Sequence, residues 1–356
     1  MTDAEHRGLV ATSATRLREE RLTEDIPTFR RGRRVLVTHD RLAGEAVELL
    51  QAHDVDVIFS PAYAPPDQVA RRVAEFQVDA LIVRQGRVTE AVIEASQRLR
   101  VIAKHGVGVD NIDLHAAAAR NIPVVRGMGS NSRAVAELAI TLSLALLKEL
   151  PWLDAAVKRG EWPKPTFIGR DIGDTVLGLV GFGSIGQQTA ALARALGMQV
   201  RVYDPHARDA IRAFDPACER TLDALLGECD IVSLHCPLTR ETRHLLDRTR
   251  IASMKRGACV VNTARGPLID EEALCEALHG GQLGGAGLDS FAEEPPPADS
   301  PLWRAPNLIA TPHIAGVTAG ASRAMALMAA QQVIDILDGG EPDARNLVRV
   351  AELATN

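Results

Sequence analysis

Two series of short, β-branched apolar runs, separated by stretches with helical spacing, constrain the fold of this chain more than any other feature. The first series occupies residues 35–40, 55–60, 80–85, 100–106 and 123–127. The second begins only at 175 and continues through 199–205, a weak element near 219–222, 229–237, 257–266, 285–291 and 307–315. Runs that alternate with helices predict βαβ units. The predicted fold class is therefore α/β, with two parallel-sheet domains in series.

Length and composition agree with two globular domains. The 356 residues exceed one usual domain, and 46% hydrophobic with 24% charged residues is ordinary for a soluble protein. The net charge of −6 gives no sign of the clustered basic surface that nucleic-acid binding requires. The longest apolar stretch, 138–147, is far shorter than the ~20 residues of a membrane span, and the N-terminus lacks a signal-peptide core. We therefore expect no nucleic acid and no membrane as partners.

The cysteines indicate a reducing compartment. Five occur, which is an odd number, and none forms a C-x-x-C pair. This pattern favours reduced thiols in a cytoplasmic protein and argues against both a disulfide framework and a zinc site. We therefore expect no metal.

Several segments fall outside the two strand series. Residues 1–32 are polar, charged and without clear period, which predicts an N-terminal extension. A long apolar helix is expected after residue 130, ending before Pro151 and buried between layers or domains. Residues 152–172 are interpreted as an irregular arm suited to packing or a subunit contact. A last helix is expected after residue 316, ended by Gly339 and Gly340.

The most specific single motif is G-x-G-x-x-G, formed by Gly181, Gly183 and Gly186 between an apolar strand and an alanine-rich helix. In a Rossmann domain these glycines allow a tight turn, close approach of a pyrophosphate, and close packing of helix on strand, while the helix N-terminus attracts phosphate. Asp204, eighteen residues after Gly186, can accept from ribose hydroxyls and would repel a 2′-phosphate. These features predict NAD rather than NADP as the cofactor.

The later strands end in residues suited to hydride transfer at a 2-oxo or 2-hydroxy acid. Ligands bind beyond the carboxyl ends of a parallel sheet. Arg265 offers a planar fork for a carboxylate there. His313 can exchange the proton of the carbon-2 oxygen, and a carboxylate beside it would favour its protonated form. The side chains at these strand ends are Cys236, Thr263, Ala264, Arg265, Asp289 and His313.

In this order, GFGSIG, VYDP, NTARGPLIDEEAL, GLDSFAEEPP and TPHIAG resemble the motifs of the D-isomer-specific 2-hydroxyacid dehydrogenase family, which includes 3-phosphoglycerate dehydrogenase. The resemblance covers roughly residues 33–348 and implies a catalytic set of Arg265, Glu294 and His313. The implied cofactor contacts are Gly181, Gly183, Ser184, Ile185, Gly186, Asp204, Cys236, Thr263, Ala264, Asp289 and Gly316, with Asp289 facing the nicotinamide amide. The implied substrate contacts are Arg84, Gln85, Val107, Gly108 and Arg265. His105, by contrast, is interpreted as a structural loop histidine.

The same resemblance implies an unusual domain order, in which the cofactor domain is inserted into the substrate domain. The substrate-binding domain would comprise residues 33–130 and 317–348, and the NAD-binding Rossmann domain residues 131–316. Both would be Rossmann- or flavodoxin-like. Relatives also form homodimers through the region that matches the helix at 133–149 and the 152–162 arm. We expect a homodimer here, and no further regulatory domain.

Two alternatives stay open at this stage. Phosphite dehydrogenases share the same Arg, Glu and His, and would want a further cation, for which Arg84 and Arg87 are candidates. NAD-sensing corepressors also keep these residues but bind peptide motifs without turnover. The sequence does not name the acid, because 3-phosphoglycerate, glycerate and glyoxylate differ in the group on carbon 3.

Overall fold

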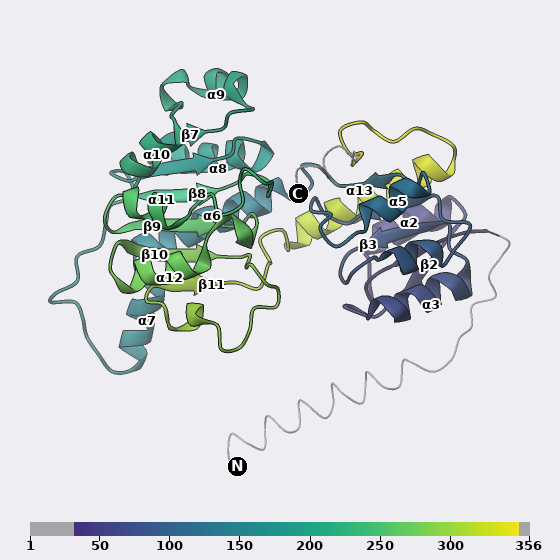
Figure 1. Cartoon of the computed structure of the whole chain (residues 1–356), viewed down its shortest axis with the longest axis horizontal. Helices are drawn as coiled ribbons and strands as arrows, with labels where there is room; N and C mark the ends of the chain where they lie inside the picture. The colour runs from purple at the N-terminus through teal and green to yellow at the C-terminus, as the bar shows by residue number, and fades with distance from the viewer. Residues whose placement is uncertain (1–31, 349–356) are drawn as a thin grey trace, which may run out of the picture.

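The computed structural model describes residues 32–348, which form two α/β lobes joined side by side (Figure 1). The predicted extension over residues 1–32 lies outside the described residues, apart from residue 32. Within the described part each lobe contains one fully parallel sheet, with strand orders β2-β1-β3-β4-β5 and β11-β10-β9-β8-β6-β7. The predicted fold class is confirmed.

The first sheet follows the first series of apolar runs. Its order is that of a flavodoxin-like, doubly wound sheet. The strand Ala80–Val83 is buried on both faces, which explains why its residues are apolar without alternation. The strands are β1 (Arg33–Val37), β2 (Val55–Phe59), β3 (Ala80–Val83), β4 (Val101–Lys104) and β5 (Val124–Val125), and the helices between them are α2 (Gly44–Ala52), α3 (Pro66–Phe76), α4 (Glu90–Glu94) and α5 (Leu114–Ala119).

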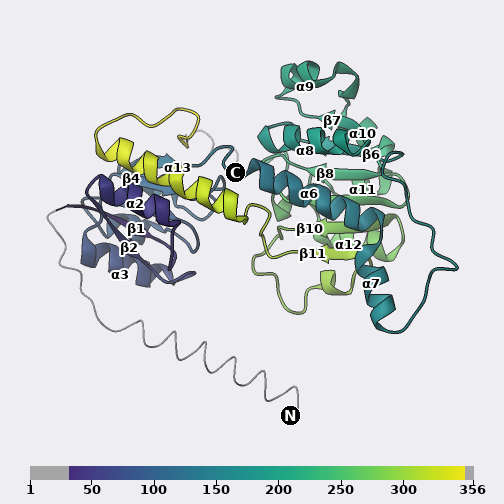
Figure 2. The same ribbon diagram turned by 180° about the vertical axis from the view of Figure 1, so that it is seen from behind.

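The last helix, α13 (Ala319–Leu337), returns from the second lobe to cover the first sheet (Figures 1 and 2). Thr318 caps its N-terminus by accepting from the Ala321 N–H, and Gly339 with φ of +91° follows its end. Val333 and its buried neighbours on α13 share one core with Val35 of β1. α13 thus packs with the first sheet, although it follows the second lobe in the sequence.

The second sheet has six strands within the described residues and is doubly wound about β6. β6 lies between β7 and β8, so the order of strands reverses at its carboxyl end, where such sheets bind ligands. The strands are β6 (Val176–Val180), β7 (Gln199–Tyr203), β8 (Ile231–Leu234), β9 (Ala258–Asn262), β10 (Leu283–Leu288) and β11 (Leu308–Ala310). The helices are α6 (Ser132–Leu147), α7 (Leu150–Lys158), α8 (Ser184–Ala195), α9 (Arg208–Phe214), α10 (Leu222–Glu228), α11 (Arg248–Ser253) and α12 (Glu271–His279), with short 3-10 turns η1 (Pro216–Cys218), η2 (Gly266–Leu268) and η3 (Pro301–Arg304).

Two local expectations were wrong. The weak element near 219–222 is no strand, since only an isolated bridge joins Val202 to Glu219 and the preceding residues form α9 and η1. The predicted irregular arm begins with a helix, α7, because Pro151 lies in its first turn, where the backbone N–H has no helical partner anyway. Figure 2 shows α7 and the segment after it projecting from the second lobe.

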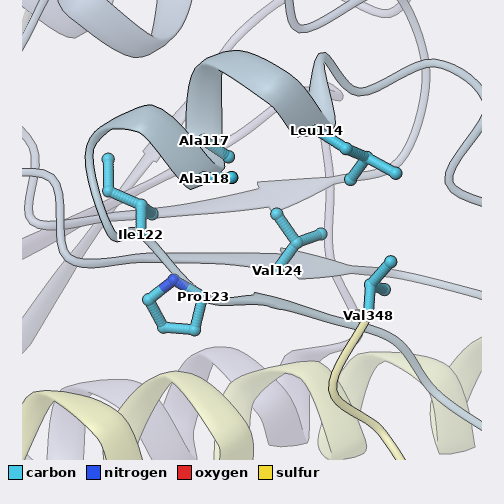
Figure 3. A pocket seen from close by; sticks show the side chains of 7 residues that line it. All are labelled: Leu114, Ala117, Ala118, Ile122, Pro123, Val124 and Val348. Carbon is cyan, nitrogen blue, oxygen red and sulfur yellow. The ribbon is translucent and has the colours of Figure 1, made fainter. Parts of the chain in front are cut away.

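A small apolar pocket opens in the first lobe beside α5 and β5 (Figure 3). Its lining carries no titratable side chain and none of the predicted site residues, so it offers no chemistry. The lining residues are Leu114, Ala117, Ala118, Ile122, Pro123, Val124 and Val348. Across residues 32–348, no helix combines the length and apolar character that crossing a membrane requires.

Candidate active site

The three glycines after β6 differ in what constrains each of them. Gly181 has φ of +101°, and a Cβ there would lie 2.6 Å from the His235 carbonyl carbon. A Cβ on Gly186 would lie 2.3 Å from the Gly181 oxygen, so helix and loop can pack only on glycine. A Cβ on Gly183 would meet no described atom within 4 Å. Gly183 therefore faces open space, and packing within the protein does not require a glycine at this position.

The start of α8 presents backbone donors beside this open space. Gly183 is its N-cap and supplies no side-chain acceptor, so the first N–H groups of Ser184, Ile185 and Gly186 point outward without a helical partner. The aligned peptide dipoles of this twelve-residue helix give its N-terminus a positive partial charge. The Ser184 hydroxyl lies 2.8 Å from that of Ser132, which ties α8 to the start of α6.

Asp204 directly follows β7 and closes the other side of the loop. One carboxylate oxygen accepts from the Phe182 N–H at 2.8 Å and the other from the His206 N–H at 2.8 Å. A carboxylate has about four acceptor positions, so each oxygen keeps one for a ligand hydroxyl. The structure thus places Asp204 at the glycine loop, where the sequence predicted it.

The ends of β8 and β9 provide a largely apolar wall. Burial raises the pKa of the Cys236 thiol to about 12, so the thiol stays protonated and unreactive. The Thr263 hydroxyl is buried and has no hydrogen-bond partner among the described residues. The neighbouring Ala264 is fixed by an N–H bond to Asn262. Together with the open face of Gly183 and the free start of α8, the unpaired hydroxyl fits a bound dinucleotide.

His313 and Glu294 form the most chemically specific contact in this region. Nδ1 of His313 lies 2.7 Å from a carboxylate oxygen of Glu294, while the other oxygen accepts from the Phe291 N–H at 3.0 Å. Burial alone would raise the pKa of Glu294, but the bond and charge of His313, with help from the Phe291 N–H and Arg265, hold it below its ordinary value. Nε2 of His313 makes no hydrogen bond to any residue between 32 and 348, so it can contact a ligand.

Asp289 holds the turn that carries His313. It is only 1% exposed, and its two oxygens accept from the Thr311 hydroxyl at 2.5 Å, the Ile314 N–H at 2.9 Å and the Ala315 N–H at 2.8 Å. His313 has φ of +53°, in the left-handed region that non-glycine residues rarely adopt. The sequence led us to expect Asp289 at the nicotinamide, and did not reveal this second task of fixing the histidine backbone.

Arg265 follows β9 and reaches the first lobe. Its Nη1 donates to the Ala264 carbonyl at 2.7 Å, and its Nη2 lies 3.0 Å from Oδ2 of Asp110. A Cβ on Gly108 would lie 2.0 Å from Nη2, so only glycine leaves room for the guanidinium. The structure therefore brings Gly108 and Arg265 together, as expected for two groups that share one anion.

The remaining predicted residues make other contacts. The Arg84 guanidinium donates to the Arg41 carbonyl at 2.5 Å, in the loop after β1, and the Gln85 side-chain oxygen is buried with no described partner. Val107 is half-buried beside Gly108. Gly316 packs against Asn131, since a Cβ there would come within 2.7 Å of its amide nitrogen. No contact of Arg84 or Gln85 with the Arg265 side chain occurs among the described residues.

His105 is satisfied in the fold, as the sequence suggested. Its Nε2 lies 3.2 Å from the Ser322 carbonyl. Burial, then the charge of Arg84, lowers the pKa of His105 to about 4, so the ring stays neutral.

Sequence reasoning missed a partly buried cation, Lys104, at the end of β4. Nζ of Lys104 donates to the Asn111 side-chain oxygen at 2.9 Å and to the Arg84 carbonyl at 3.4 Å. Burial lowers the pKa of Lys104 to about 8, against the opposing pull of Asp110. The available signal was a single lysine ending an apolar strand. Residues 32–348 contain no cluster of three or more His, Cys, Asp or Glu side chains arranged to hold a metal ion.

Comparisons with known proteins agree with this geometry. The sequence model described as the NAD binding domain of D-isomer specific 2-hydroxyacid dehydrogenases matches residues 140–315. The hydroxypyruvate reductase of Thermotoga maritima is 39% identical over 298 residues, which cover 83% of this chain and 95% of that protein. The D-3-phosphoglycerate dehydrogenase of Methanocaldococcus jannaschii is also 39% identical, over 308 residues that cover 86% of this chain. The match spans only 58% of that second protein.

Solved structures extend the likeness to both lobes. The crystal structure of a protein from Thermus thermophilus superposes with a TM-score of 0.79 and 38% sequence identity. The superposition covers 89% of this chain and all of the other.

Proposed function

Since the chain belongs to the D-isomer specific 2-hydroxyacid dehydrogenase family, we propose that it is an NAD-dependent oxidoreductase that moves a hydride between nicotinamide and carbon 2 of a D-2-hydroxy acid or its 2-oxo acid. The observation that carries the proposal is the 2.7 Å contact between His313 and Glu294. These two residues and Arg265 follow three neighbouring strands, β11, β10 and β9. An acid–base histidine oriented by a carboxylate is the group that this reaction needs at the carbon-2 oxygen.

NAD, when bound, supplies or accepts the hydride. The start of α8 and the open face of Gly183 would hold its pyrophosphate, and Asp204 its ribose, while Ser184, Ile185, Cys236, Thr263, Ala264, Asp289 and Gly316 would line the rest of its site. A carboxylate at position 204 disfavours the 2′-phosphate of NADP, which supports NAD.

Arg265 would bind the substrate carboxylate and polarise the carbonyl. The backbone N–H groups of Val107 and Gly108 would share that carboxylate, because Gly108 lies directly against the guanidinium. Protonated His313 would donate from Nε2 to the carbon-2 oxygen during reduction and take the proton back during oxidation. Glu294 at Nδ1 would fix the ring and stabilise its charged form.

The substrate is proposed from the named relatives. One is called a hydroxypyruvate reductase and another a D-3-phosphoglycerate dehydrogenase, so 3-phosphoglycerate, glycerate and glyoxylate are the acids to test first. Arg84 and Gln85 would lie toward the carbon-3 group. Phosphite oxidation and a non-enzymatic corepressor role are not favoured, because both relatives carry the names of 2-hydroxy acid enzymes.

The direct test is a panel of 2-oxo acids, comprising hydroxypyruvate, 3-phosphohydroxypyruvate, glyoxylate and pyruvate, each with NADH and with NADPH. The proposal expects oxidation of NADH by at least one of them, a lower rate with NADPH, and a D-configured product from any acid that yields a chiral one. NADH formation from phosphite without any 2-oxo acid turnover would instead support the phosphite alternative.

A homodimer in the cytoplasm completes the proposal. Trp152 and Val157 on α7, with Trp162 and Ile168 beyond it, expose large apolar surfaces, and Ile168 is 91% exposed. Such a patch favours a protein partner. The five cysteines are free thiols, which suits a reducing compartment.

Placing a charge in the exposed patch tests the dimer. Trp152→Glu is expected to yield monomers, because the charge would have to be buried in the contact. Sedimentation velocity measures the change, and Arg240→Glu, a substitution on an exposed loop outside the patch, serves as a control. A monomeric wild-type protein at micromolar concentration would refute the dimer.

A further inference from the structure

We propose that Asp110 is a positioning residue for Arg265, so that a carboxylate of one lobe sets the orientation of the substrate-binding cation of the other. This inference rests on the proposed role of Arg265 in binding the acid. Asp110 lies in the loop after β4 of the first sheet, and Arg265 follows β9 of the second. The pair therefore forms only while the two lobes hold these loops together.

The contacts fix the guanidinium from two sides. Oδ2 of Asp110 lies 3.1 Å from Nε and 3.0 Å from Nη2 of Arg265. This one oxygen therefore accepts from the N–H groups along the Nε–Nη2 edge of the guanidinium. Nη1 donates to the Ala264 carbonyl at 2.7 Å on the opposite side. A guanidinium has five N–H groups, and these three contacts leave one N–H on each terminal nitrogen. No other described residue accepts from those two.

The free edge is therefore the terminal one, and it suits a bidentate carboxylate. Nη2 lies against Gly108, where a Cβ would come within 2.0 Å. An acid bound at this edge could also reach the backbone of the 107–108 segment. Asp110 thus holds the cation without covering the edge that the substrate would use.

The neighbouring residue anchors the Asp110 loop in the first lobe. Asn111 donates from Nδ2 to the Gly86 carbonyl at 2.5 Å, and its Oδ1 accepts from Nζ of Lys104 at 2.9 Å. Its backbone carbonyl accepts from the Val88 N–H at 2.8 Å. Three bonds on one residue hold the loop in place, although the Asp110 side chain itself is 63% exposed. A fixed loop can impose a position on Arg265, whereas a mobile one could not.

The test measures binding of oxamate, a non-reacting 2-oxo acid analogue, to the NADH-loaded full chain by fluorescence. Asp110→Asn is expected to raise the Kd of oxamate by about three- to tenfold, as fits a partly exposed charged contact. The Kd of NADH should stay unchanged, and Asp110→Glu should recover part of the loss. Glu94→Gln removes the same charge from an exposed position on α4 and is expected to leave both constants as they are.

The second arm asks whether Asp110 acts through Arg265. In an Arg265→Lys background, which itself weakens oxamate because lysine cannot form the fork, Asp110→Asn is expected to add little. In turnover, Asp110→Asn should raise the KM of the 2-oxo acid more than it lowers kcat.

Three results would overturn the inference. They are an oxamate Kd that stays unchanged or tightens in Asp110→Asn, additive effects in the double variant, and no oxamate binding to the wild-type holoenzyme. Tightening would show that Asp110 competes with the substrate. If the wild type reduces no 2-oxo acid while oxamate responds as expected, the proposed function fails and the positioning of Arg265 stands.

Discussion

His313 is held from both its side chain and its backbone. Glu294 fixes the ring through Nδ1, and Asp289 accepts from Thr311, Ile314 and Ala315 around the histidine. The left-handed backbone of His313 costs energy that these bonds offset. Strained residues held in place by their surroundings are typical of functional sites. Here the two carboxylates keep the imidazole ring of His313 in one orientation.

Replacing Glu294 with Gln tests the role of this carboxylate beside His313. The amide keeps the size of the side chain but removes the charge that stabilises a protonated His313. The kcat for 2-oxo acid reduction should therefore fall roughly 10- to 100-fold. Glu293→Gln, on the exposed neighbouring glutamate, is the matched control. A kcat in Glu294→Gln close to that of the wild type would contradict the assigned pairing.

At the scale of elements, most site residues could be predicted because they follow the carboxyl ends of strands. The apolar runs located each strand because parallel strands are buried on both faces, and their carboxyl ends then placed Asp204, Arg265 and His313 at one sheet edge. The helix α7 was missed because Pro151 was taken as a break rather than as a first-turn residue.

Contacts between distant loops could not be predicted in this way. Asp110 and Arg265 are 155 positions apart, and nothing in the local pattern around either one indicates the other. Likewise, the pairing of Glu294 with His313 came from the family resemblance. In the acidic, proline-rich stretch at 289–297, periodicity cannot distinguish a solvated carboxylate from a paired one, because only tertiary packing decides which oxygen finds a donor.

Substitutions at two glycines near the start of α8 should distinguish effects on cofactor binding from effects on stability. Gly183→Ala is expected to leave the urea midpoint unchanged, since the added methyl group meets no described atom, but to weaken NADH binding about tenfold or more by approaching the pyrophosphate. Gly186→Ala, by contrast, should destabilise the fold, because its Cβ would overlap the Gly181 oxygen. Equal losses of stability in the two variants would contradict this division.

At the scale of the whole molecule, the buried His105 and the partly buried His235 should make stability depend on pH. Burial lowers the pKa of His105 and of His235 to about 4. Between pH 6.5 and 4 the unfolded chain therefore binds protons that the folded chain does not. The free energy of unfolding should fall as the pH drops through this window, by at most about 1.4 kcal/mol per pH unit for each histidine.

Urea unfolding at pH 7.5 and at pH 5.0 measures this effect. His235→Asn should reduce the difference between the two midpoints, while His206→Asn, at an exposed position, should leave it unchanged. The same pH dependence in all three proteins would show that carboxylates, not these histidines, govern acid unfolding.

The proposed reaction as a whole depends on proton transfer by His313, and single-turnover reduction of the best 2-oxo acid by bound NADH tests that step directly. His313→Ala should slow the decay of NADH absorbance roughly 10²- to 10⁴-fold, while the Kd of NADH stays within about twofold of the wild type. A His313→Ala protein that oxidises NADH at a near-normal rate would contradict the account.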